Sequence, residues 1–335
     1  MKVYELPPWM PNWIDKHLKG LGFALNRPKE LAKAIMSASN NYQSSDSTTP
    51  WGDPKGQAAY LAYFFPLNYI RSLKVIDEAK HWNLFDGVSE SMDFGCGPGT
   101  FSKALLQDAD INIDRITGVD NHRELASLFL DSTRQRTELQ FQTEPIKPRT
   151  RQSLLIASYV LNEISDIPRW LIDFKRIIVM EPSTKQMFPK LQDLRDHLID
   201  KGYNIVAPCP HHLECPLSQS KKDWCHDRVH WQQPSWFEKI ENELPIKNRT
   251  LSFSYLIVTR EPVERPDYWR VVGDDLVEKG KTRWMLCRNE NREFLSHLKR
   301  QGKAPEVYRG DRIHLKEWQL KGQEIRFEKE NLTQV

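Results

Sequence analysis

The residues most able to do chemistry are crowded between positions 205 and 231, in IVAPCPHHLECPLSQSKKDWCHDRVHW. This segment holds three of the five cysteines and four of the ten histidines of the chain. Cys209, Cys215 and Cys225 lie in it, and Cys287 follows later in RWMLCRN. In an intracellular protein thiols stay reduced, so clustered cysteines indicate metal binding or catalysis rather than disulfides.

The spacing of these cysteines does not identify the metal. Five and nine residues separate the first three, unlike the two-residue knuckle that is typical of structural zinc. An iron–sulfur cluster can take its ligands from separate loops, and the prolines of the segment would stiffen the approach of each thiolate. Rival nitrogen ligands are His211, His212, His226 and His230. From spacing alone, an iron–sulfur cluster, zinc and no metal all remain open.

A second candidate site lies in MDFGCGPGTFS, where Asp93, Gly95, Gly97 and Gly99 stand between a predicted strand and a predicted helix. Glycine permits a sharp turn and the close approach of a ligand to the backbone. The amides of the loop and of the helix N-terminus would then face that ligand. The dinucleotide fingerprint would require a glycine at position 100, which is Thr100. A purely structural turn is the alternative.

An acidic residue supports ligand binding at this loop. ITGVD ends in Asp120, 21 residues beyond Gly99, and a carboxylate at the tip of a second strand can accept both ribose hydroxyls. The spacing of the loop resembles that of class I S-adenosylmethionine (SAM) methyltransferases. The resemblance implies that the loop embraces the methionine moiety and that Asp93 lies near its amine. We interpret Cys96, within the loop, as a small buried residue.

No catalytic residue can be named from the sequence. The segment after the expected fourth strand reads ASYVLNEIS and lacks the Asp/Asn-Pro-Pro-aromatic motif that amino-methylating enzymes usually carry there. Asn162 and Glu163 are candidates for contact with the cofactor, Asn162 being our choice, and capping of the next helix is the alternative.

The elements around these sites alternate. We expect strands at 91–95, 115–120, 138–144, 153–161, 177–182, 203–208 and 252–260, and helices at 100–109, 121–133, 168–176 and 188–202. Such alternation predicts an α/β fold with a mostly parallel sheet. We place a helical N-terminal region at 1–88, with a break or kink at Pro66, and a methyltransferase-like domain at 89–260, with the cysteine-rich insertion at 207–231. A small β-rich C-terminal appendage at 261–335 would supply Cys287.

Composition is that of a soluble globular protein, with 39% hydrophobic and 28% charged residues. No run of 18 apolar residues is present, so we expect no membrane span. The first residues lack the features of a signal or transit peptide, which favours the cytoplasm. Net charge is only +3, yet residues 201–335 carry 24 Lys and Arg against 20 Asp and Glu, whereas residues 1–200 carry 24 against 25. This bias permits a nucleic-acid partner.

Several stretches in a fixed order resemble one family. DFGCGPGT, ASYVLNEI, VMEPST, APCPHHLECPL, DWCH and FSYLIVTR, together with YLAYFFPLNYIRS, are similar to the bacterial and mitochondrial methyltransferase-like assembly factors of the small ribosomal subunit. The resemblance covers about residues 55–315. It implies the class I methyltransferase fold, SAM as cofactor, and a 4Fe–4S cluster held by Cys209, Cys215, Cys225 and Cys287.

The resemblance also implies the partner, small-subunit ribosomal RNA in the assembling subunit. We expect an rRNA methyltransferase. The alternative is a non-catalytic assembly factor in which SAM and the metal site are structural or regulatory. Contacts to phosphates are expected from Lys221, Lys222 and Arg228, and stacking on an unpaired base from Trp224 or Trp231, with shielding of the metal site as the other role for Trp224.

Overall fold

The computed structural model describes residues 2–43, 49–131, 136–150, 153–220, 222–264 and 267–335. Contacts divide the chain into two compact units. The glycine-loop unit comprises residues 2–168 and 229–251, and the cysteine unit comprises residues 169–228 and 252–335. Within the described ranges, no helix has the length and apolar character that crossing a bilayer would require.

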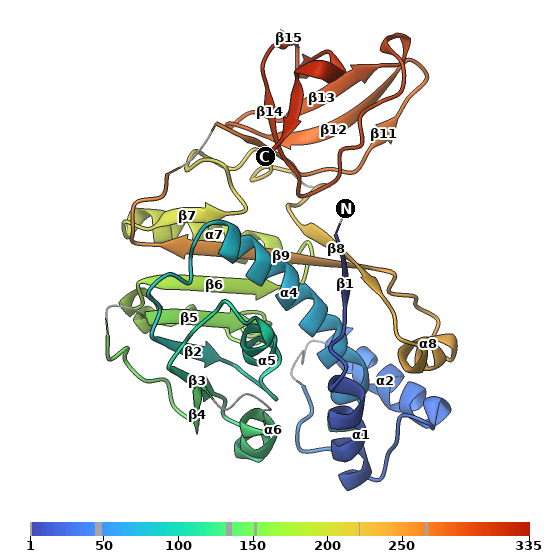
Figure 1. Cartoon of the computed structure of the whole chain (residues 1–335), viewed down its shortest axis with the longest axis vertical. Helices are drawn as coiled ribbons and strands as arrows, with labels where there is room; N and C mark the ends of the chain where they lie inside the picture. The colour runs from blue at the N-terminus through green and yellow to red at the C-terminus, as the bar shows by residue number, and fades with distance from the viewer. Residues whose placement is uncertain (1, 44–48, 132–135, 151–152, 221, 265–266) are drawn as a thin grey trace. The chain divides into compact units, whose positions relative to one another are not determined.

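A parallel sheet forms the centre of the glycine-loop unit (Figure 1). Its strands run in the order β5-β2-β3-β4 and are all parallel. Met92 of β2 lies opposite Thr117 of β3 and Leu155 of β5. The bounds are β2 Glu90–Phe94, β3 Arg115–Val119, β4 Glu138–Gln142 and β5 Ser153–Ser158. β5 and the centre of β2 are buried, as expected for strands that are covered on both faces.

Short helices connect these strands. α5 (Thr100–Gln107) follows β2, and a 3₁₀ turn (Arg123–Leu125) leading into α6 (Ala126–Leu130) follows β3. The glycine loop joins β2 to α5, and strand–helix units repeat along the parallel sheet. This is the Rossmann-like α/β fold of the class I methyltransferase type, as the sequence predicts. The helix expected over 121–133 is shorter than predicted, and residues 132–135 lie outside the described ranges.

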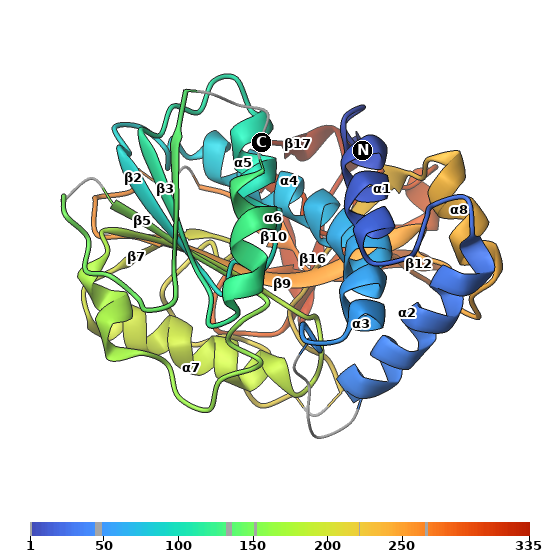
Figure 2. The same cartoon turned by 90° about the horizontal axis from the view of Figure 1, so that it is seen from below.

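Helices of the N-terminal region pack together in the same unit (Figure 2). They are α1 Met10–Gly20, α2 Pro28–Gln43, α3 Pro54–Ala59 and α4 Phe65–His81, with α8 Ser235–Asn242 beside α2. The break expected at Pro66 takes the form of a π-helical turn, Tyr60–Phe64, that joins α3 to α4. Pro66 lies in the first turn of α4, where N–H groups have no partner within the helix, so the missing N–H of a proline is tolerated there.

Two strands of this region were missed by the sequence pattern. β1 (Val3–Glu5) pairs in parallel with β8 (Asp227–Gln232), with Tyr4 opposite Trp231. β8 lies inside the segment that the sequence presents as an irregular metal-binding loop. Its side chains alternate between buried and less buried positions.

In the cysteine unit, β9 (Thr250–Thr259) runs antiparallel to both β6 (Arg176–Glu181) and β7 (Asn204–Ala207). α7 (Met187–Asp200) connects β6 to β7. The helix expected over 168–176 is only a 3₁₀ segment, Arg169–Asp173. Antiparallel pairing around β9 explains why the molecule is mostly, and not wholly, parallel in its α/β part.

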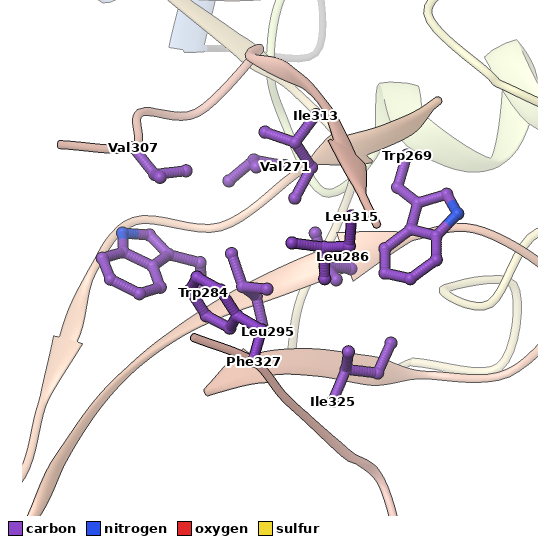
Figure 3. Packing of buried hydrophobic residues seen from close by; sticks show 10 residues of the cluster. All are labelled: Trp269, Val271, Trp284, Leu286, Leu295, Val307, Ile313, Leu315, Ile325 and Phe327. Carbon is purple, nitrogen blue, oxygen red and sulfur yellow. The ribbon is translucent and has the colours of Figure 1, made fainter. Parts of the chain in front are cut away.

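The rest of the cysteine unit is β-rich, as predicted for 261–335, and has its own apolar core (Figure 3). Its strands are β10 Trp269–Val271, β11 Leu276–Val277, β12 Lys281–Cys287, β13 Glu293–Leu298, β14 Arg312–Leu315, β15 Gln319–Lys321, β16 Glu324–Arg326 and β17 Leu332–Gln334. Short 3₁₀ turns occupy Lys299–Gln301 and Lys329–Asn331. Trp284, Leu295 and Ile325 meet in the core, and Cys287 ends β12.

Candidate functional site

The glycine loop turns tightly at the carboxyl end of β2. The N–H groups of Gly95 and Cys96 both donate to the Val119 carbonyl, at 2.8 and 3.2 Å. Gly95, Gly97 and Gly99 have φ angles of +65°, +53° and +80°, which other residues adopt only at a cost. The predicted glycines are therefore required by the backbone itself.

The three glycines differ in what a side chain at each position would contact. A Cβ on Gly95 would lie 2.3 Å from Val160, and one on Gly99 would lie 2.8 Å from Phe129, so both glycines are also enforced by neighbouring side chains. A Cβ on Gly97 would meet only Trp51, at 3.5 Å. Gly97 is thus the loop glycine at which packing alone would tolerate a Cβ, although the residue is buried and the Trp51 ring covers it.

Asp120 lies directly beside Gly97. Its Oδ2 accepts a hydrogen bond from the Gly97 N–H at 2.9 Å, and its Oδ1 accepts one from the His122 N–H at 3.0 Å. The carboxylate that the sequence assigns to a ribose therefore joins the loop to the end of β3. Each of its oxygens still has lone-pair directions for hydroxyl donors.

Asp93 is buried, with 1% of its surface exposed, and its Oδ2 accepts a hydrogen bond from the Ser102 hydroxyl of α5 at 2.6 Å. Burial raises the pKa of Asp93 to about 7, the nearby Asp120 carboxylate adds to the rise, and Ser102 opposes it. Burial and Asp120 also raise the pKa of Glu163 to about 7. Glu163 keeps an exposed surface, so solvent offsets part of this rise. Three carboxyl groups that repel one another at this loop favour a cationic ligand.

Sequence reasoning missed Trp51. It precedes α3, in a stretch that reads only as a polar loop. It is nevertheless buried and packs over Gly97, and its ring centroid lies 4.7 Å from that of Tyr60.

Asn162 is half-buried in the turn after β5, in which the Glu163 N–H donates to the Val160 carbonyl at 3.0 Å. Cys96 is buried, and burial raises the pKa of its thiol, as expected for a packing residue.

The four cysteines line a single cavity of about 60 Å³ within the cysteine unit. Cys209 and Cys215 come from the segment after β7, Cys225 precedes β8, and Cys287 ends β12. Burial raises the pKa of the Cys215 thiol to about 11, and burial together with the other cysteines raises the pKa of Cys225 and Cys287 further. The fold thus gathers the four residues that the sequence leaves up to 78 positions apart (287 − 209).

Part of the cavity wall is apolar. Cys215, Cys225 and Cys287 pack with a buried cluster that contains Phe188, Leu217, Val272 and Met285. As the side chains are placed, no group of three or more His, Cys, Asp or Glu side chains among the described residues lies close enough to hold a metal ion. Three of the four thiols have raised pKa values. If these buried thiols are to ionise, the cavity must hold a positively charged group.

The rival histidines divide into two pairs. The ring of His212 accepts a hydrogen bond from the Ile205 N–H at 3.1 Å, and His230 contacts the Thr250 hydroxyl at 3.4 Å, so both have other roles. His211 Nε2 lies 3.4 Å from Cys287 Sγ, and His226 lines the cavity while its Nδ1–H donates to the Trp224 carbonyl. His211 and His226 are thus the nitrogen ligands nearest the thiols.

The expected RNA contacts of this segment need correction. Trp231 is buried, donates its indole N–H to the Asn248 carbonyl at 2.7 Å and packs on Phe237, so it cannot stack on a base as placed. Trp224 donates to the Ser183 carbonyl and packs with the cysteines, which is the shielding role. Arg228 pairs with Asp274 at 2.8 Å. Lys222 is exposed, and Lys221 lies outside the described residues.

Comparisons with solved structures find methyltransferases at low identity. A plantazolicin methyltransferase, crystallised with a desmethylPZN analogue and SAH, is 12% identical, with a TM-score of 0.37 over 70% of this chain and 98% of that one. The methyltransferase domain of bacterial CtHen1 is 14% identical (TM-score 0.35; 58% and 100% covered). Magnesium protoporphyrin IX methyltransferase from Synechocystis PCC 6803, with bound SAH, is 13% identical (0.31; 56% and 83%). No curated protein matches the chain.

A family model matches most of the chain. It is the model described as mitochondrial small ribosomal subunit Rsm22, and it aligns with residues 54–315. The matched range includes the glycine loop, Asp120 and all four cysteines of the cavity. Because it spans well over half of the 335 residues, the chain belongs to the Rsm22 family.

Proposed function

We propose that this protein binds SAM at the glycine loop, carries a 4Fe–4S cluster at its four clustered cysteines, and methylates ribosomal RNA in the assembling small subunit. The observation that carries the proposal is the loop itself. Three left-handed glycines at alternate positions shape it, and the Gly97 N–H is hydrogen-bonded to Asp120, at the carboxyl ends of parallel strands where ligands of such sheets bind.

Each residue of the loop has a defined part in this proposal. The loop amides and Gly97 would bind the methionine part, Asp120 would accept the ribose hydroxyls, and Asn162 would contact the cofactor from the turn after β5. SAM, when bound, supplies an electrophilic methyl group on a positively charged sulfur. Asp93 and Glu163 would favour that charge, and the protein's main task is to align the acceptor with the methyl group.

Calorimetry with SAM tests this part. Asp120→Ala should weaken binding by roughly 1.5–3 kcal/mol, the usual worth of a hydrogen bond to a charged group. Asp114→Asn is the matched control, because Asp114 is exposed at the opposite end of the same strand and should leave binding unchanged. Wild-type protein that binds no SAM, or an Asp120→Ala variant that binds as tightly as the wild type, would refute the assignment.

The proposed cluster rests on the shared cavity of Cys209, Cys215, Cys225 and Cys287 and on the family resemblance. A cluster is larger than one ion and can take its thiolates from separate loops, as the four cysteines of this cavity would supply them. Anaerobically purified protein should be brown, with iron and sulfide near four each per chain. Colourless protein with one zinc per chain would instead establish zinc as the metal.

The family description supports the partner, the small ribosomal subunit, and that same description names the mitochondrial one. Our prediction from the sequence is the cytoplasm, and imaging of a tagged protein distinguishes the two compartments. A second candidate function is a non-catalytic assembly factor. It is favoured by the turn after β5, where Tyr159 and Val160 stand in place of a recognisable catalytic motif.

A further inference from the structure

Two buried arginines line the cavity of the four cysteines, and neither was noticed in the sequence. Arg195 projects from α7 and Arg270 from β10, with 4% and 3% of their surfaces exposed. A buried guanidinium stays charged, so each requires compensating negative charge or several hydrogen-bond acceptors. The partners of the two arginines differ.

Arg270 is fully compensated from within the protein. Its Nη2 donates to Asp227 Oδ2 at 2.7 Å and to the Tyr255 hydroxyl at 2.6 Å, and Asp227 is equally buried. This pair is neutral overall and joins β10 to the start of β8.

Arg195 is compensated only in part. Its Nη2 donates to the carbonyls of His211 and Leu213, at 3.1 and 2.8 Å, which holds the segment that carries Cys209 and Cys215. Its Nη1 pairs with Asp196, whose side chain is 60% exposed, so solvent weakens that attraction. Its Nε is buried and has no hydrogen-bond partner among the residues that the structure describes.

Arg195 lines the same cavity as the four thiols. The carbonyls that it binds lie between Cys209 and Cys215 in the chain, and its guanidinium interacts with the Cys209 side chain. Four thiolates outweigh the charge of an oxidised 4Fe–4S core, so the bound group is an anion. One-electron reduction makes it more negative, and a buried cation stabilises the reduced form more than the oxidised form.

We propose that Arg195 is a positioning residue of the metal centre, which holds the Cys209 segment by its two carbonyls and raises the reduction potential of the cluster with its buried positive charge. This inference rests on the proposed function, because it requires a cluster at the four cysteines. The potential depends on charge and on hydrogen bonds to the sulfur atoms, and both would come from one side chain.

Redox titration of anaerobically purified protein, followed by the EPR signal of the reduced cluster, tests the inference. Only cluster-loaded protein gives this signal, so the measured potential is independent of how much cluster each variant retains. Arg195→Gln should shift the potential to more negative values, and Arg195→Lys, which keeps the charge, should shift it less. Lys190→Gln removes a positive charge from the exposed part of the same helix and should leave the potential unchanged.

A second pair of variants leaves Arg195 in place, in case Arg195→Gln does not retain the cluster. Asp196→Asn removes the carboxylate that offsets Arg195 and should shift the potential to more positive values. Asp193→Asn, at an exposed position of the same helix, should shift it less. If Arg195→Gln matched the wild-type potential, or shifted it no more than Arg195→Lys, or if Asp196→Asn and Asp193→Asn shifted it equally, Arg195 would have only a structural role. Wild-type protein without iron would overturn the cluster itself.

Discussion

At the residue scale, the three loop glycines differ in what a side chain would meet. Gly99→Ala would place a Cβ 2.8 Å from the buried Phe129 ring and would also strain the backbone. We expect it to lower the free energy of unfolding by about 2–4 kcal/mol, the sum of left-handed strain and overpacking. Gly97→Ala meets only Trp51, at ordinary contact distance, so it should cost about 1–2 kcal/mol for strain alone.

Urea denaturation and calorimetry separate these two effects. Gly97→Ala should fold better than Gly99→Ala and lose SAM affinity, because strain at a left-handed position shifts the loop amides that would contact the ligand. A Gly97→Ala protein that is as unstable as Gly99→Ala, or that binds SAM like the wild type, would contradict this account of the loop.

Asp93 leads to a prediction about pH. Its pKa is about 7 in the folded protein, against about 3.9 in an unfolded chain. Between these values the folded state holds a proton that the unfolded state has lost, so the free energy of unfolding falls as pH rises from about 4 to 7. The slope from this one group approaches about 1.4 kcal/mol per pH unit. Above pH 7 the group is ionised in both states, and its effect is constant.

Asp93→Asn has no such proton and serves as the comparison. The difference in stability between Asp93→Asn and wild-type protein, without SAM, should grow in favour of the variant from pH 5 to pH 7 and then level off. Chemical denaturation at four pH values measures this. A difference that stays constant over pH 5–7 would mean that Asp93 ionises normally.

Sequence reasoning found the glycines and Asp120 because their roles follow from backbone geometry and local order along the chain. It could not find Trp51 or Arg195. Neither belongs to a motif, and each reaches its site only through tertiary packing. Trp231 was wrongly assigned to RNA contact. An aromatic residue among basic ones also occurs in a strand that buries one face and exposes a charged one, and β8 is such a strand.

At the element scale, a buried ion pair joins β10 to the start of β8. Asp227→Asn would leave the Arg270 charge buried without its partner, and such losses typically cost 3–5 kcal/mol. Tyr255→Phe removes one hydrogen bond from the same guanidinium and should cost about 1.5–3 kcal/mol. Urea denaturation followed by tryptophan fluorescence compares the two variants. Equal losses would mean that Asp227 is not the dominant partner of Arg270.

Elements with their own periodic pattern were predicted well. β5 and β6 are apolar runs, β2 leads into the glycine loop, β3 ends just before Asp120, and α5 and α7 have amphipathic spacing. β1 was missed because it has three residues and is stabilised by pairing with His230–Gln232, far along the chain. β8 was missed because its polar residues, Asp227, Arg228 and His230, suggested ligands and phosphate contacts.

At the scale of the whole molecule, the chain belongs to one family and carries two candidate sites. The glycine-loop unit holds the proposed SAM site, and the cysteine unit holds four thiols with a buried cation beside them. The fold class follows from the alternation of strands and helices. The convergence of Cys209 and Cys287 does not, because the two residues are far apart in the chain and meet only through tertiary packing around their shared cavity.

The most direct test is methyl transfer to the native partner. Small-subunit precursors from cells that lack this protein are incubated with it and with SAM labelled in the methyl group, and the RNA nucleosides are analysed by mass spectrometry. We predict label in one small-subunit rRNA nucleoside, its loss with Asp120→Ala, and its persistence with Asp114→Asn. Absence of label from the RNA, with a wild-type protein that binds both SAM and the precursors, would contradict the enzyme and support the non-catalytic assembly factor.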